Sequence, residues 1–90
     1  MTKISIIIPC YNEKNTIVQL INILNNLQIN KQIILVDDFS YDGTREIIEK
    51  DLSNKVDKII FHKKNLGKGA CIKTAKEFIL GDLVVIQDAD

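Results

Sequence analysis

The sequence predicts an α/β fold, with helices on both faces of a mostly parallel sheet. Short apolar runs rich in β-branched residues alternate along the chain with segments in which apolar residues recur at helical spacing. This alternation is typical of βαβ units, whose crossover helices bring the strands together in parallel. A domain as short as these 90 residues buries only about 60% of the surface that its unfolded chain exposes. We therefore expect a part of a larger domain.

The first βα unit is predicted by an almost continuously apolar run and the helical pattern that follows it. Residues 4–8 read Ile-Ser-Ile-Ile-Ile, as expected of a central strand covered on both faces, and we expect Pro9 to end this strand. A helix over residues 14–28 is predicted by apolar side chains at helical spacing, namely Ile17, Leu20, Ile21, Leu24 and Leu27.

The second unit begins with a strand over residues 32–36. Polar residues 37–44 supply turn and capping side chains, and a short helix carrying Ile47 and Ile48 follows them.

The third and fourth strands are predicted over residues 58–61 and 82–87. Between them, residues 65–69 open a helix, and Gly81 is placed to cap it. The buried face of that helix is expected to carry Cys71, Ala75, Phe78 and Ile79.

Composition is ordinary and excludes several classes. Hydrophobic residues make up 46% of the chain, and twelve basic residues balance twelve acidic ones, so charge favours neither nucleic acid nor an anionic membrane as a partner. The apolar runs are far shorter than the ~20 residues of a membrane span, and no signal peptide is evident. We expect a cytoplasmic protein. Cys10 and Cys71 form no CxxC pair and are interpreted as buried free thiols, and His62 as a strand-end histidine.

The sequence ends with two carboxylates one residue apart, Asp88 and Asp90, after the fourth predicted strand. Like charges at ~4 Å repel by roughly 4 kcal/mol at an effective dielectric of 20, and a divalent cation reverses that sign. Oxygen ligands suit magnesium or manganese, which often complete their coordination with water and substrate phosphates. The pattern suits a metal-bound nucleotide diphosphate, but taken without other motifs it favours a solvated acidic strand end.

Polar loops follow all four strands, and ligands of open α/β sheets bind at the carboxyl ends of the strands. The usual glycine-rich phosphate loops are not present. No glycine follows the first strand, as a G-x-G-x-x-G turn would require, and the Walker pattern does not occur. A nucleotide would have to be held in another way.

Four motifs follow one another along the chain: Pro9-Cys10-Tyr11-Asn12-Glu13, the run from Val36 to Thr44 with Asp37, Asp38, Ser40 and Asp42, Asn65-x-Gly67-Lys68-Gly69, and Asp88-Ala89-Asp90. In this order they resemble the nucleotide-binding half of family-2 glycosyltransferases with the GT-A fold. The form Gln87-Asp88-Ala89-Asp90 is similar to the branch that includes polyprenol-phosphate sugar synthases. The resemblance implies a Rossmann-like GT-A half of four βα units, truncated after the fourth strand, with residues 1–90 as one nucleotide-sugar-binding part.

The resemblance also implies roles for particular residues. Pro9, Tyr11 and Glu13 would line the base and ribose, and Asp38 would accept a hydrogen bond from a base N–H. The Val36 backbone would lie against the base, and Lys68 would add charge near the phosphates. Asp88, Ala89 and Asp90 would complete the substrate site, with Asp88 and Asp90 as ligands of magnesium or manganese.

The donor implied by this resemblance is a UDP- or GDP-sugar, and the acceptor is a polyprenyl phosphate, another lipid or a saccharide. No catalytic base falls within the segment, so we expect nucleotide binding without turnover. Parts outside the segment could place the protein at the cytoplasmic face of a membrane. Phe39 departs from the family pattern, which often has glycine after the acidic pair.

Two alternatives stay open. Asp37 and Asp38 together with the strand before Asp88 also resemble a magnesium-binding signalling receiver domain, in which Asp88 would be phosphorylated. Each site residue also has a purely structural interpretation: Asn12 as a helix cap, for example, or Asp37 as an anchor of its own loop.

Overall fold

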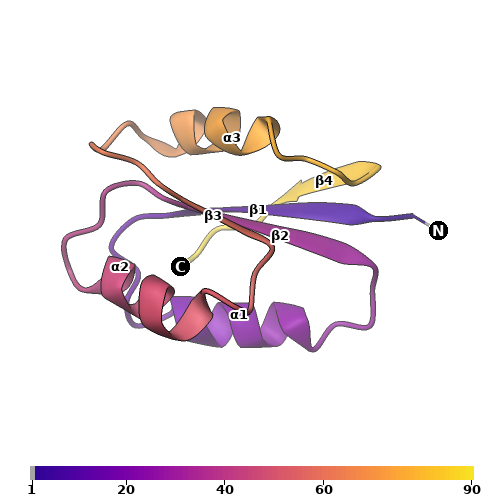
Figure 1. The fold of residues 1–90 in the computed structure, drawn as a ribbon, viewed down its shortest axis with the longest axis horizontal. Helices are drawn as coiled ribbons and strands as arrows, with labels where there is room; N and C mark the ends of the chain where they lie inside the picture. The colour runs from indigo at the N-terminus through magenta and orange to yellow at the C-terminus, as the bar shows by residue number, and fades with distance from the viewer. Residues whose placement is uncertain (1) are drawn as a thin grey trace.

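The computed structural model describes residues 2–90, which form one parallel four-stranded sheet between two layers of helix (Figure 1). The strand order is β3-β2-β1-β4, and all three strand pairings are parallel. The expected fold class is confirmed. The elements in chain order are β1 (Ile4–Cys10), α1 (Ile17–Asn25), β2 (Lys31–Asp37), α2 (Thr44–Ile47), the π-helical turn η1 (Ile48–Leu52), β3 (Lys58–Phe61), α3 (Lys68–Lys76) and β4 (Leu83–Ile86).

The central strands β1 and β2 are apolar on both faces because helices cover both faces. Alternate residues point to opposite sides of a strand, so Ile6 and Ile8 pack toward α1 and η1, whereas Ile7 packs toward α3. Figure 1 shows α1 and α2 on one side of the sheet and α3 on the other. The pattern of residues 4–8 and 32–36 thus reflects two separate apolar layers.

Strand β1 does not end at Pro9, contrary to expectation, but continues to Cys10 with Pro9 opposite Val36. Proline is tolerated because of the side to which its nitrogen points. The Cys10 carbonyl accepts from the Asp38 N–H, just after β2, and the Ile7 carbonyl accepts from Gln87. Pro9 therefore faces β4, whose pairing with β1 ends at Ile7. Pro9 lacks an N–H, but the sheet requires no hydrogen bond from its nitrogen at this position.

Two helix boundaries also differ from the predictions. Helix α1 begins at Ile17 and ends at Asn25, shorter than residues 14–28, and Leu27 lies exposed beyond it. Helix α3 ends at Lys76, so Gly81 does not cap it. Instead the Gly81 N–H donates to Ser5 Oγ at 2.8 Å, and a β-carbon at this position would lie 2.7 Å from the Lys3 carbonyl oxygen. Close backbone approach explains this glycine.

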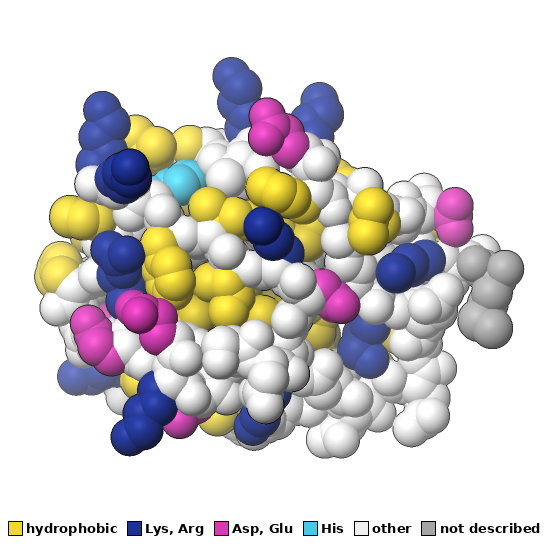
Figure 2. All heavy atoms as spheres, in the orientation of Figure 1, with side chains coloured by type: hydrophobic (Ala, Val, Ile, Leu, Met, Phe, Trp, Pro, Cys, Tyr) yellow, Lys and Arg dark blue, Asp and Glu magenta, His cyan; other side chains and the backbone are white. Residues whose placement is uncertain are grey.

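The two edge strands are partly uncovered. In Figure 2 the edge formed by β3 faces the viewer, and hydrophobic side chains show there among charged ones. The four side chains of β4 on the opposite edge are all exposed. Among residues 2–90, the helices lack the combination of length and apolar character needed to span a bilayer.

Candidate functional site

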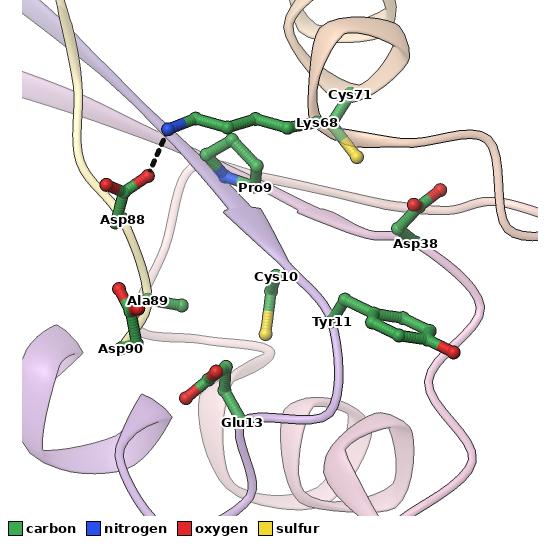
Figure 3. A pocket seen from close by; sticks show the side chains of 10 residues that line it. All are labelled: Pro9, Cys10, Tyr11, Glu13, Asp38, Lys68, Cys71, Asp88, Ala89 and Asp90. Carbon is green, nitrogen blue, oxygen red and sulfur yellow. Dashed lines mark hydrogen bonds and ion pairs between the residues drawn. The ribbon is translucent and has the colours of Figure 1, made fainter.

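A pocket of about 330 Å³ opens at the carboxyl ends of the central strands (Figure 3). It brings together all the predicted site residues except Val36, which is fully buried and does not line it. The pocket also includes two residues that the motifs did not single out, Cys10 and Cys71. Its lining residues are Pro9, Cys10, Tyr11, Glu13, Asp38, Lys68, Cys71, Asp88, Ala89 and Asp90.

The pocket has two chemically different ends. Figure 3 shows the Tyr11 ring and the Asp38 carboxylate at one end, and the Asp88 and Asp90 carboxylates at the other. Lys68 extends from the start of α3 toward Asp88, with which its ammonium group forms an ion pair. An aromatic ring and a carboxylate at one end, and two carboxylates with a lysine at the other, suit a ligand with a ring system and charged groups at opposite ends.

The acidic end is held in place through Ala89. The Ala89 side chain is 4% exposed and packs in the apolar layer with α1, while its carbonyl oxygen lies 2.7 Å from the Thr16 hydroxyl. Because Ala89 points inward, the carboxylates on either side of it remain exposed. Two exposed carboxylates fit a divalent cation of the magnesium or manganese type, which needs oxygen ligands and leaves positions for water and phosphate.

The other end is organised by Asp38, whose side chain is almost fully buried. Its Oδ1 accepts from His62 Nδ1 at 2.8 Å and from the Leu66 N–H at 2.9 Å. Its Oδ2 accepts from the Gly67 N–H at 2.8 Å and from Asn65 Nδ2 at 3.1 Å. Burial alone would raise the pKa of Asp38, but the hydrogen bonds from His62, Leu66 and Gly67 outweigh it and hold the pKa below its ordinary value. The carboxylate is therefore ionised at neutral pH.

His62 is the residue that the sequence did not reveal. It is 7% exposed, and its two ring nitrogens contact different elements: Nδ1 contacts Asp38 and Nε2 lies 2.8 Å from the Thr74 hydroxyl of α3. A single histidine after an apolar run carries no signal of such a role, because both partners are remote along the chain.

His62, Asp38 and Cys71 place possible metal-ligating atoms within 4.8 Å of one another. The arrangement does not favour a metal, however, because both ring nitrogens and all four acceptor positions of the carboxylate already have partners. Burial also raises the pKa of Cys71 to about 12, so its thiol stays protonated at neutral pH.

The loop after β2 is bound to the loop after β1. Asp37 accepts from the Ser40 N–H at 3.0 Å and from its hydroxyl at 2.6 Å, which confirms that Asp37 fixes its own loop. Asn12 is not a helix cap: its N–H donates to Ser40 Oγ, and its Oδ1 accepts from the Tyr41 N–H. Phe39 lies between these contacts at φ +67°, the left-handed conformation that glycine adopts most easily.

The comparisons with known proteins identify the family of this chain. The pattern of the family described as "Glycosyl transferase family 2" matches residues 5–90. An undecaprenyl-phosphate 4-deoxy-4-formamido-L-arabinose transferase from Aeromonas hydrophila is 33% identical over 93 residues, which cover 97% of this chain and 28% of the relative. The chain spans 25% to 29% of the length of the curated relatives it matches.

Two solved structures share the fold closely. S. aureus TarS 1-349 in complex with UDP superposes with a TM-score of 0.86 at 31% identity, over 98% of this chain and 27% of that one. Mannosyltransferase PcManGT from Pyrobaculum calidifontis, in complex with GDP-Man and Mn2+, gives 0.82 at 28% identity, over 97% and 27% of the two chains. Against the receiver interpretation, every acceptor position of the buried Asp38 carboxylate already receives a hydrogen bond, which leaves none for magnesium. This chain belongs to glycosyl transferase family 2.

Proposed function

We propose that residues 1–90 are the nucleotide-sugar-binding part of a glycosyltransferase that transfers a sugar from a nucleoside-diphosphate sugar to an acceptor. The observation that carries this proposal is the single pocket in which four loops, distant along the chain, bring Tyr11 and Asp38 to one end and Asp88 and Asp90 to the other. Its volume of about 330 Å³ falls in the range of small-molecule sites.

The end formed by Tyr11 and Asp38 is proposed to take the base and ribose, with Pro9 and Glu13 beside them. Tyr11 is 41% exposed and packs edge-on against Tyr41, so its ring can contact a ligand from its present position. Asp38 can accept from a base N–H only if one of its present donors leaves. Asn65 is the donor that can do so, because it is exposed and forms the longest of the four contacts.

The acidic end is proposed to take the diphosphate together with a divalent cation, manganese or magnesium, held by Asp88 and Asp90. When bound, the cation would neutralise charge on the diphosphate leaving group as its bond to the sugar breaks. Lys68 pairs with Asp88 in the absence of ligand, and we infer that its ammonium group shifts to a phosphate oxygen once the cation neutralises Asp88. Val36 is proposed to contribute only backbone, because its side chain is fully buried.

The acceptor is proposed to be a polyprenyl phosphate. The Gln87–Asp90 sequence and the A. hydrophila relative, named for an undecaprenyl-phosphate acceptor, support this choice. Action at the cytoplasmic face of a membrane would follow from it. The carboxylates of the pocket are assigned to the nucleotide and the cation, so none is proposed as a catalytic base, and we predict nucleotide binding without sugar transfer by residues 1–90 alone.

Calorimetric titration of residues 1–90 with UDP and with GDP, each with and without MnCl₂, tests the proposal. Asp90→Asn should abolish the gain in affinity that manganese gives while leaving the weak metal-free affinity in place. Asp51→Asn, which changes an exposed acid on η1 away from the pocket, is the matched control and should behave as the unmodified chain. If the chain binds neither UDP nor GDP, or if manganese raises the nucleotide affinity of both variants equally, the assignment is contradicted.

A further inference from the structure

The contacts of His62 suggest a role in ligand binding that neither the family motifs nor the comparisons assign. Its ring joins the Asp38 carboxylate at the pocket to Thr74 on α3, and the side chain is buried. Asp38 in turn accepts from the backbone of Leu66 and Gly67, the residues that lead into α3. A chain of hydrogen bonds therefore runs from the helix, through the histidine and the carboxylate, to the loop that precedes Lys68.

The direction of these hydrogen bonds follows from the partners. An ionised carboxylate only accepts, so His62 Nδ1 must carry the proton that faces Asp38. In a neutral ring Nε2 then accepts, and the Thr74 hydroxyl donates to it. Thr74 thus fixes the plane of the ring, and the ring fixes one oxygen of Asp38.

We propose that His62 is a positioning residue for the nucleotide: it orients Asp38 and, through Asp38, the loop of residues 65–67 that shapes the base end of the pocket. This inference rests on the proposed function, because it assumes a ligand at that end. His62 itself does not line the pocket, so its effect is exerted through Asp38.

Two substitutions separate the two contacts of the ring. His62→Asn places an amide N–H near the position of Nδ1 and can still donate to Asp38, but it loses Thr74. His62→Gln reaches toward the position of Nε2 and can still meet Thr74, but it loses Asp38. Each variant loses one of the two hydrogen bonds, and His62→Gln loses the buried one to a charged group, which contributes more to stability than the part-buried one to Thr74. Urea unfolding of both variants therefore serves as the control for folding.

The variants should differ in nucleotide affinity by more than their difference in stability explains. With UDP or GDP as the probe, whichever binds the unmodified chain more tightly, we expect His62→Gln to weaken affinity roughly tenfold, a change equivalent to 1.4 kcal/mol. His62→Asn should stay within about threefold of the unmodified chain. Hydrogen exchange gives a second readout that needs no ligand: the amides of Leu66 and Gly67 should exchange faster in His62→Gln and keep their protection in His62→Asn.

The outcomes distinguish failure of the proposed function from failure of the role inferred for His62. If the unmodified chain binds neither nucleotide, the proposed function fails together with the ligand role inferred here, whatever the exchange data show. If it binds but both variants lose affinity in proportion to their stability, His62 is only a structural residue and this inference alone is overturned. Equal amide protection of Leu66 and Gly67 in the two variants would overturn it as well.

Discussion

Replacing Asp38 with asparagine should destabilise the folded chain strongly although the two side chains have nearly the same shape. The carboxylate accepts four hydrogen bonds, two on each oxygen. An amide keeps one oxygen and turns the other acceptor into a donor, so two of the four donors lose their partner in either orientation of the amide. Each hydrogen bond to a charged group contributes about 1.5–3 kcal/mol.

Two lost hydrogen bonds would together cost roughly 3–6 kcal/mol, and the structure favours the lower end of this range. If the amide faces Asn65 and Gly67, the Asn65 side chain is exposed and can turn to water, whereas the half-buried Gly67 N–H has less access to it. We therefore expect Asp38→Asn to lower the free energy of unfolding by about 3 kcal/mol, a large share of the 5–15 kcal/mol typical of small domains.

Urea unfolding followed by circular dichroism at pH 7 measures this effect. Asp51→Asn removes the same charge from an exposed site and should change stability by less than about 0.5 kcal/mol. Because hydrogen bonding holds the pKa of Asp38 below its ordinary value in the folded state, its stabilising contribution is complete above about pH 4 and is lost as the pH falls through the folded pKa. The difference between Asp38→Asn and the unmodified chain should therefore shrink toward pH 3. A loss under 1 kcal/mol at pH 7, or a difference independent of pH, would refute the reasoning.

Three further predictions concern single positions. Phe39→Gly should raise the free energy of unfolding by about 1 kcal/mol in urea unfolding, because Phe39 holds a left-handed φ of +67° with a half-exposed ring; destabilisation would mean that the ring packing outweighs the strain. Gly81→Ala should cost roughly 2 kcal/mol in the same assay, since its β-carbon would meet the Lys3 carbonyl oxygen at 2.7 Å, and an unchanged midpoint would show that the loop shifts freely. Burial raises the pKa of Cys71 to about 12, so a thiol reagent at pH 8 should modify it only at the rate of unfolding, and fast labelling of the folded chain would contradict its burial.

The strands were predictable because their signal is local. A strand covered on both faces must be apolar at nearly every position, and residues 4–8 and 32–36 show this directly. The helix ends were not predictable in this way, because contacts with residues remote along the chain determine them. The predicted start of α1 at residue 14 fails because Lys14 donates its N–H to Asp42 and Thr16 contacts Ala89, contacts that hold residues 14–16 in turns.

The location of the site was predictable, but the environment of its residues was not. Loops that follow parallel strands meet at one edge of the sheet, so Tyr11, Asp38 and Asp88 could be expected to lie close together from their positions alone. Which of them is free to meet a ligand depends on partners that the sequence does not identify. Asp38 is saturated by residues 24 to 29 positions away, whereas Asp88 has only an exposed lysine.

This difference in support predicts that the two ends of the pocket respond differently to substitution. The end formed by Tyr11 and Asp38 is held by hydrogen bonds to the buried Asp38 carboxylate, which stay formed as long as His62 and the loop of residues 65–67 keep their places. The acidic end is held through the backbone of Ala89 and the Thr16 hydroxyl, contacts that involve neither Asp38 nor His62. A ligand that reaches both ends therefore meets a rigid surface at one and an exposed ion pair, able to exchange partners, at the other. Discrimination between bases should consequently depend on the Asp38 network, and the response to metal should depend on Asp88 and Asp90.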